Sequence, residues 1–108
     1  MGTTLGDLEQ LVLLALLRLG DDAFGVSVQH EISARTQRDV SLGAIYTTLA
    51  RLEQKGYVST RIGDPTPVRG GRRKKYYRLG ASGRLVLGAA LADLRAMSRG
   101  LTIALDRP

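Results

Sequence analysis

The chain of 108 residues lacks cysteine and tryptophan and contains a single histidine. Without cysteine, disulfides and thiolate metal sites are excluded, and one histidine is too few for a histidine-rich metal site. Aromatic residues are also scarce, at 5% of the sequence. Because a small monomer with so few large side chains would be marginally stable, this composition favours an oligomer.

Long hydrophobic runs are absent as well. The longest, residues 11–17, contains seven residues, whereas a membrane span needs about 20. Asp7 and Glu9 precede this run, where a secretory signal would carry basic residues. We therefore expect no membrane association and a cytoplasmic location.

Residue groups that could carry out catalysis are missing too. The sequence has no second histidine, no glycine motif that would cradle a phosphate after a strand, and no repeated carboxylate pair on one helix face. We interpret Glu53 as the partner of an arginine or a backbone group, and His30 as a surface residue. The sequence therefore predicts a protein that is not an enzyme and that uses no cofactor and no metal.

Positive charge, by contrast, is abundant and concentrated. The formal net charge is +6, and residues 57–80 contain seven Arg and Lys residues against a single acid, Asp64. Two runs of alternating side chains, 57–62 and 74–79, flank a loop rich in Gly, Pro and Arg, a pattern typical of a β-hairpin. A basic hairpin of this kind is suited to binding a phosphate backbone.

Helical spacing of apolar residues predicts four helices around this hairpin. They are expected over residues 5–19, 24–36, 41–56 and 82–105. In the third, Ser41 is a good N-cap, and Val40 and Ile45 are placed for a hydrophobic staple. The predicted fold is mainly α with a small β-hairpin: a winged helix-turn-helix DNA-binding domain over residues 1–80, followed by a C-terminal dimerisation helix over residues 81–108.

The outer face of the third helix and the hairpin together suggest DNA recognition. Small and polar side chains near a helix N-terminus can approach DNA closely, and the free N–H groups there favour phosphate. Arginines at a glycine-rich hairpin tip can follow phosphates or enter the minor groove. The candidate DNA-binding residues are Ser41, Gly43, Tyr46, Thr47, Thr48, Arg51, Arg69, Gly71, Arg72, Arg73, Lys74 and Lys75.

The last predicted helix carries a seam of leucines with the spacing of a coiled coil, with a serine at one place in the repeat. This seam predicts pairing of two chains through the last helix, with help from the first. The candidate dimerisation residues are Leu87, Leu91, Leu94, Ser98 and Leu101.

These motifs resemble one family. The segment from Ser41 to Gly56, followed by the basic stretch Arg72–Leu79 and Gly83, is similar to the PadR family of bacterial transcriptional regulators, in particular its subgroup with a single short C-terminal helix. The resemblance covers residues 5 to about 101. It implies a winged-helix dimer that binds palindromic operator DNA, usually as a repressor released by a ligand.

Three positions depart from the family pattern. Thr47 stands where the family often has proline, Val26 and Ser27 replace a common Tyr-Glu pair, and Gly80 stands where threonine usually caps the last helix. The last departure leaves Ser82 as the alternative cap, which would shorten the helix.

The sequence therefore predicts a regulator, most simply a repressor, that binds double-stranded operator DNA as a homodimer. It assigns no residue to a small-molecule effector. One alternative is an architectural protein that uses the same basic hairpin to bind nucleic acid without sequence preference. Another is a winged helix whose recognition face binds a partner protein.

Overall fold

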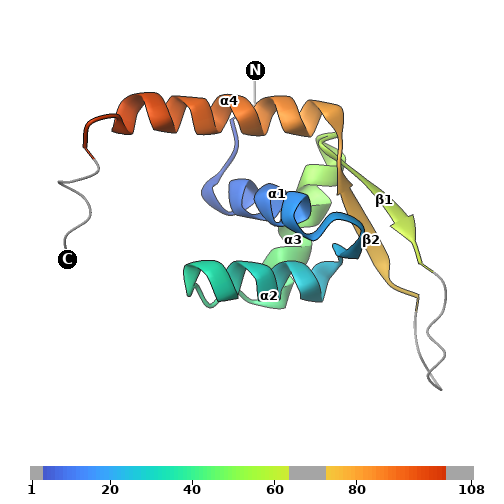
Figure 1. Ribbon diagram of the computed structural model, residues 1–108. Helices are drawn as coiled ribbons and strands as arrows, with labels where there is room; N and C mark the ends of the chain where they lie inside the picture. The colour runs from blue at the N-terminus through green and yellow to red at the C-terminus, as the bar shows by residue number, and fades with distance from the viewer. Residues whose placement is uncertain (1–3, 64–72, 102–108) are drawn as a thin grey trace.

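The computed structural model describes residues 4–63 and 73–101, which form a mainly helical fold with one β-hairpin, as the sequence predicts (Figure 1). Arg69, Gly71 and Arg72 lie outside the described residues. The elements in chain order are α1 (Asp7–Leu19), the 3₁₀ helix η1 (Gly20–Asp22), α2 (Gly25–Thr36), α3 (Leu42–Gln54), β1 (Val58–Ile62), β2 (Lys75–Leu79) and α4 (Ala81–Ser98).

Helix α1 begins two residues later than the apolar pattern predicts. Gly6 is its N-cap, and the Gly6 N–H donates to Glu9 Oε1 at 2.8 Å. This bond satisfies one of the amide groups that a helix start leaves without a partner. At the other end, Gly20 has a positive φ of 59°, a conformation that glycine adopts without steric cost.

The core lies between the first three helices. Their largest fully buried side chains are Leu13, Ile45, Leu49, Leu52, Val12 and Val28. Of the apolar residues at helical spacing along α3, Ile45, Leu49 and Leu52 are fully buried, whereas Leu42 is only partly buried. A core of interlocking aliphatic side chains holds α3 rigidly and turns its opposite face to solvent.

The hairpin, which we call the wing, pairs β1 and β2 antiparallel from Val58↔Leu79 to Ile62↔Lys75. The segment before α2 joins it, because the Tyr77 N–H donates to the Ala23 carbonyl at 2.8 Å. The Tyr77 side chain is buried beneath the wing. The wing is thus attached to the helical body through β2.

Helix α4 lies across one end of the body and projects beyond it (Figure 1). It begins at Ala81, with Gly80 as N-cap, and ends at Ser98. The predicted extension to about residue 105 is wrong, because the chain leaves the helix at Arg99 and Gly100 then adopts a φ of 82°. The alternative cap is also wrong, since the Ser82 hydroxyl donates to the Gly56 carbonyl instead.

Candidate nucleic-acid interface

Helix α3 and its N-cap carry six of the twelve candidate DNA-binding residues, and four of these lie on the outward face of the helix. Ser41 is the N-cap, as predicted, and its Oγ accepts from the Ala44 N–H at 3.1 Å. Gly43, Thr47 and Arg51, spaced by four residues, are all exposed. The first two turns therefore present a shallow surface of small and polar groups, with a guanidinium one turn further along.

Thr48 does not belong to this surface. Its side chain is buried, with the residue only 4% exposed, and its hydroxyl donates to the Ala44 carbonyl at 2.8 Å. Threonine often satisfies its hydroxyl within its own helix in this way. Of the two adjacent threonines, only Thr47 turns its side chain to solvent.

Tyr46 lies on the flank of α3 that faces α2. It remains 45% exposed, and its ring covers Gly25, the first residue of α2. The side chain thus has one covered face and one accessible edge at the junction of the two helices.

The basic residues at the base of the wing are exposed, but most are held by neighbours. Lys74 Nζ lies 4.2 Å from the centre of the Phe24 ring, and Lys75 Nζ lies 3.3 Å from Glu53 Oε1 on α3. Glu53 therefore pairs with a lysine rather than with the expected arginine or backbone group. Arg73 is exposed and forms no ion pair within the described part of the chain.

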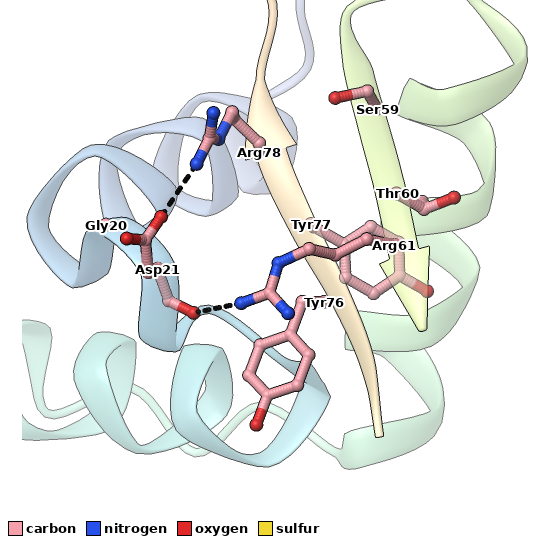
Figure 2. Close-up of a pocket in the computed structure, with 8 residues that line it drawn as sticks. All are labelled: Gly20, Asp21, Ser59, Thr60, Arg61, Tyr76, Tyr77 and Arg78. Carbon is pink, nitrogen blue, oxygen red and sulfur yellow. Dashed lines mark hydrogen bonds and ion pairs between the residues drawn. The ribbon is translucent and has the colours of Figure 1, made fainter. Parts of the chain in front are cut away.

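The other face of the wing is tied to the body by Asp21 of η1 (Figure 2). Asp21 Oδ1 lies 2.8 Å from Arg78 Nη2, and the Asp21 carbonyl accepts from Arg61 Nη2 at 3.1 Å. The Arg61 guanidinium also lies 4.3 Å from the centre of the Tyr76 ring. One residue of η1 thus binds an arginine from each strand and limits how far the wing can tilt.

These contacts surround a shallow hollow of about 250 Å³. Its lining residues are Gly20, Asp21, Ser59, Thr60, Arg61, Tyr76, Tyr77 and Arg78. Both arginines that line the hollow, Arg61 and Arg78, are already bound to Asp21. We therefore interpret the hollow as a consequence of how the wing packs on η1. Asp21 was missed by the sequence interpretation, which treated it as part of a turn.

A second missed acid links α1 to α3. Glu9 is buried, and its Oε2 lies 2.8 Å from Lys55 Nζ at the end of α3. Lys55, which follows Arg51 by one turn on the outer face, is therefore drawn back toward the body. No pattern of spacing within one helix signals this contact, because the two residues lie 46 positions apart.

The candidate dimerisation residues divide into two groups. Leu87 is buried, and Leu91 is partly buried against the same core. Leu94 and Leu101 are 56% and 49% exposed, and Ser98 is exposed. Met97, which the leucine spacing did not select, is 80% exposed beside them. The first half of the seam is thus packed within the chain, whereas the second half is open.

Two features are absent from the described residues. None of their helices is long and apolar enough to cross a membrane. They also contain no group of three or more His, Cys, Asp or Glu side chains that could hold a metal ion.

Comparison with known proteins gives a consistent result. Residues 13–89 match the model of the family described as "Transcriptional regulator PadR-like family". No curated protein is significantly similar to the chain in sequence.

Solved structures match over most of the chain. A PadR family transcription regulator from Clostridium difficile R20291 has 23% identity and a TM-score of 0.76, with 93% of this chain and 99% of that chain covered. A PadR-like transcriptional regulator from Bacillus cereus has 19% identity and a TM-score of 0.72, with 94% and 93% covered. Bacillus subtilis PadR in complex with operator DNA has 23% identity and a TM-score of 0.66, with 79% of this chain but 46% of that chain covered.

Proposed function

The chain belongs to the PadR-like family of transcriptional regulators, and from this premise we propose that it is a repressor that binds palindromic operator DNA as a homodimer. As a member of this family it is a transcriptional regulator and not an enzyme. Release from DNA by a small-molecule effector is part of the proposal, and no described residue is assigned to it.

The observation that carries the proposal is the exposed face at the start of α3. Gly43 and Thr47 offer a surface that a base edge can approach closely, and Arg51 lies one turn further along. Because α3 is anchored by three fully buried side chains, it can enter a major groove as a rigid unit. Direct contacts with base edges in that groove would determine the sequence specificity.

The wing would supply affinity and orientation. The Lys75–Glu53 pair joins the base of the wing to α3, and the neighbouring exposed residues Arg73 and Lys74 are proposed to contact phosphates. Arg69, Gly71 and Arg72 complete the proposed wing tip. Lys75 is expected to contribute less to DNA affinity than the sequence suggests, because its charge is paired with that of Glu53. The relative from Bacillus subtilis, whose structure contains operator DNA, supports DNA as the partner.

Selection of binding sites from random DNA with the purified protein tests the proposal. We expect the recovered sequences to converge on a palindrome whose half-sites lie about one helical turn apart, about 34 Å, because a two-fold dimer places two α3 helices in successive major grooves. Footprinting on the recovered site should then show sharp protection. A uniform ladder with no consensus would instead favour an architectural protein.

The two adjacent threonines provide a matched pair of variants. Thr47→Val removes an outward hydroxyl and should reduce discrimination between the selected site and random DNA by about fivefold or more. Thr48→Val removes the same group from the inward position and should leave discrimination unchanged. Equal effects of the two substitutions on measured affinities would contradict the proposed reading face.

A further inference from the structure

The position of Tyr46 depends on a residue outside the recognition helix. Its ring lies over Gly25, and a Cβ atom built at Gly25 would overlap Cε1, Cζ and Oη of Tyr46, all closer than real side chains allow. Gly25 is not among the described glycines with positive φ. Its backbone would therefore accept any residue, and what the site requires is the absence of a side chain.

This contact restricts a side chain of the proposed reading surface. With the hydroxyl end of its ring against Gly25 in the first turn of α2, Tyr46 keeps 45% of its surface exposed. A side chain already held in one orientation loses less conformational freedom on binding, and its hydroxyl is presented at a defined place. The same ring without Gly25 beneath it would point elsewhere.

We propose that Gly25 is a positioning residue for DNA recognition: it seats the Tyr46 ring so that the hydroxyl and ring edge contact DNA at a fixed point, and thereby contributes to the choice of sequence. The inference rests on the proposed function and adds a specificity-determining residue from α2 to the face of α3.

The geometry separates this role from a purely structural one. The atoms that a Gly25 Cβ would meet belong to the far end of the Tyr46 side chain, not to backbone. The ring can therefore swing outward while α2 and α3 stay in place. Gly25→Ala should fold and bind DNA, but with Tyr46 displaced.

The experiment compares wild type and Gly25→Ala by selection from a random DNA library, followed by affinity measurements on the wild-type site and a scrambled site. We expect the ratio of the two affinities to fall by about tenfold, the cost of one lost base contact, while affinity for the scrambled site stays within about twofold. Gly88→Ala is the matched control, because Gly88 lies in α4 with no other side chain or backbone within 4 Å of a built Cβ.

A double-mutant cycle makes the test specific. In a Tyr46→Ala background no ring remains to be displaced, so Gly25→Ala should cause no further change in the affinity ratio. The melting temperature should then not fall, and should rise only by the small amount expected when alanine replaces glycine in a helix. If Gly25→Ala alone fails to fold, the double variant should recover folding, since the added methyl group fits into the space left by the ring. Failure of both to fold overturns the proposal.

Two results separate this proposal from the proposed function. A wild-type consensus that Gly25→Ala leaves unchanged overturns the positioning role and leaves the function standing. Absence of any wild-type consensus overturns both, although coupling between the two substitutions in the melting temperature would still report the contact. A tenfold loss of discrimination that is equal in both backgrounds also overturns the positioning role.

Discussion

At the scale of single residues, Glu9 shows how a buried charge is retained. Burial raises the pKa of this carboxyl, but the hydrogen bonds from Lys55 and from the Gly6 N–H outweigh burial, so the pKa lies below the ordinary value of 4.5. A carboxylate whose pKa is depressed by folding stabilises the folded state above its unfolded pKa. This contribution is lost as the pH falls through the folded-state pKa.

Glu9→Gln should therefore lower stability at neutral pH and flatten its dependence on pH. We expect a loss of about 1–3 kcal/mol in the free energy of unfolding at pH 7, because the amide keeps an acceptor for Gly6 but leaves Lys55 without its countercharge. Urea unfolding at pH 7 and pH 4 measures both effects. The difference between variant and wild type should shrink at pH 4.

The matched control is Glu31→Gln, which breaks the i,i+4 pair between Glu31 and Arg35 on the surface of α2. Such pairs contribute about 0.3–0.5 kcal/mol. A Glu9→Gln variant no less stable than this control would show that the Glu9–Lys55 pair adds nothing to folding.

Single residues also show where sequence patterns fail. The role of Ser41 as a cap follows from its position at the start of one helix, and it was predicted correctly. The burial of Thr48 was not predicted. At the edge of the apolar face of a helix, a small rotation of the helix decides whether a side chain meets solvent or the core. Asp21 and Glu9 contact partners on other elements, which spacing along one element does not reveal.

At the scale of elements, the helices and strands were predicted in type and order, and errors lie at their ends. The extent of α4 was overestimated because the leucine spacing continues past Gly100, where the chain has already turned. The start of α4 is determined by a contact with the wing. A Cβ atom at Gly83 would overlap the Tyr57 carbonyl oxygen and Leu79 Cδ1, so the first turn of α4 can lie this close to β1 only with glycine.

Gly83→Ala should therefore destabilise the protein. Because one of the overlapping atoms belongs to the backbone, the helix itself must shift, and we expect a loss of about 1–3 kcal/mol, as in overpacked cores. The melting temperature measures the effect.

Gly88→Ala again serves as the control, since it replaces glycine in the same helix at a site with open space. It should stabilise the protein by about 0.5–1 kcal/mol through its effect on helix propensity. Equal melting temperatures of the two variants would contradict the close packing of α4 on Tyr57.

The wing illustrates how charge in a sequence differs from charge on a surface. Its seven basic residues together with its single acid, Asp64, give +6, which equals the formal net charge of the whole chain. In the structure Lys75 pairs with Glu53 and Arg78 pairs with Asp21. The wing was correctly predicted as a basic hairpin, but the acids that orient it come from α3 and η1 and could be identified only in three dimensions.

At the scale of the whole molecule, the exposed second half of the α4 seam is suited to packing against another chain. Leu94 and Met97 near the C-terminal end of α4, and Leu101 just after it, are 56%, 80% and 49% exposed. Clustered apolar side chains on a small protein typically mark an interface, and in the proposed homodimer the partner at this interface is a second copy of the chain. Leu87 and Leu91 already pack on the chain's own core, so the proposed contact between chains shifts toward the end of the helix.

Leu94→Glu should therefore dissociate the dimer without unfolding the monomer, because the side chain is 56% exposed in the single chain. A substitution at Leu91 would be less informative, since that residue also stabilises the monomer. Light scattering coupled to size exclusion should show the mass falling to that of one chain, 11.7 kDa, while the far-ultraviolet circular dichroism stays unchanged.

Leu85→Glu is the control for added charge on α4. Leu85 is 76% exposed and, at about 100° per residue, lies on the opposite side of the helix from Leu94. If the open seam is the interface, Leu85→Glu remains a dimer and keeps its affinity for a palindromic site, whereas Leu94→Glu binds that site only as weakly as a single half-site. Dissociation by Leu85→Glu with an intact Leu94→Glu dimer would move the interface to the outer face of α4, and the two recognition helices would then be spaced differently on DNA.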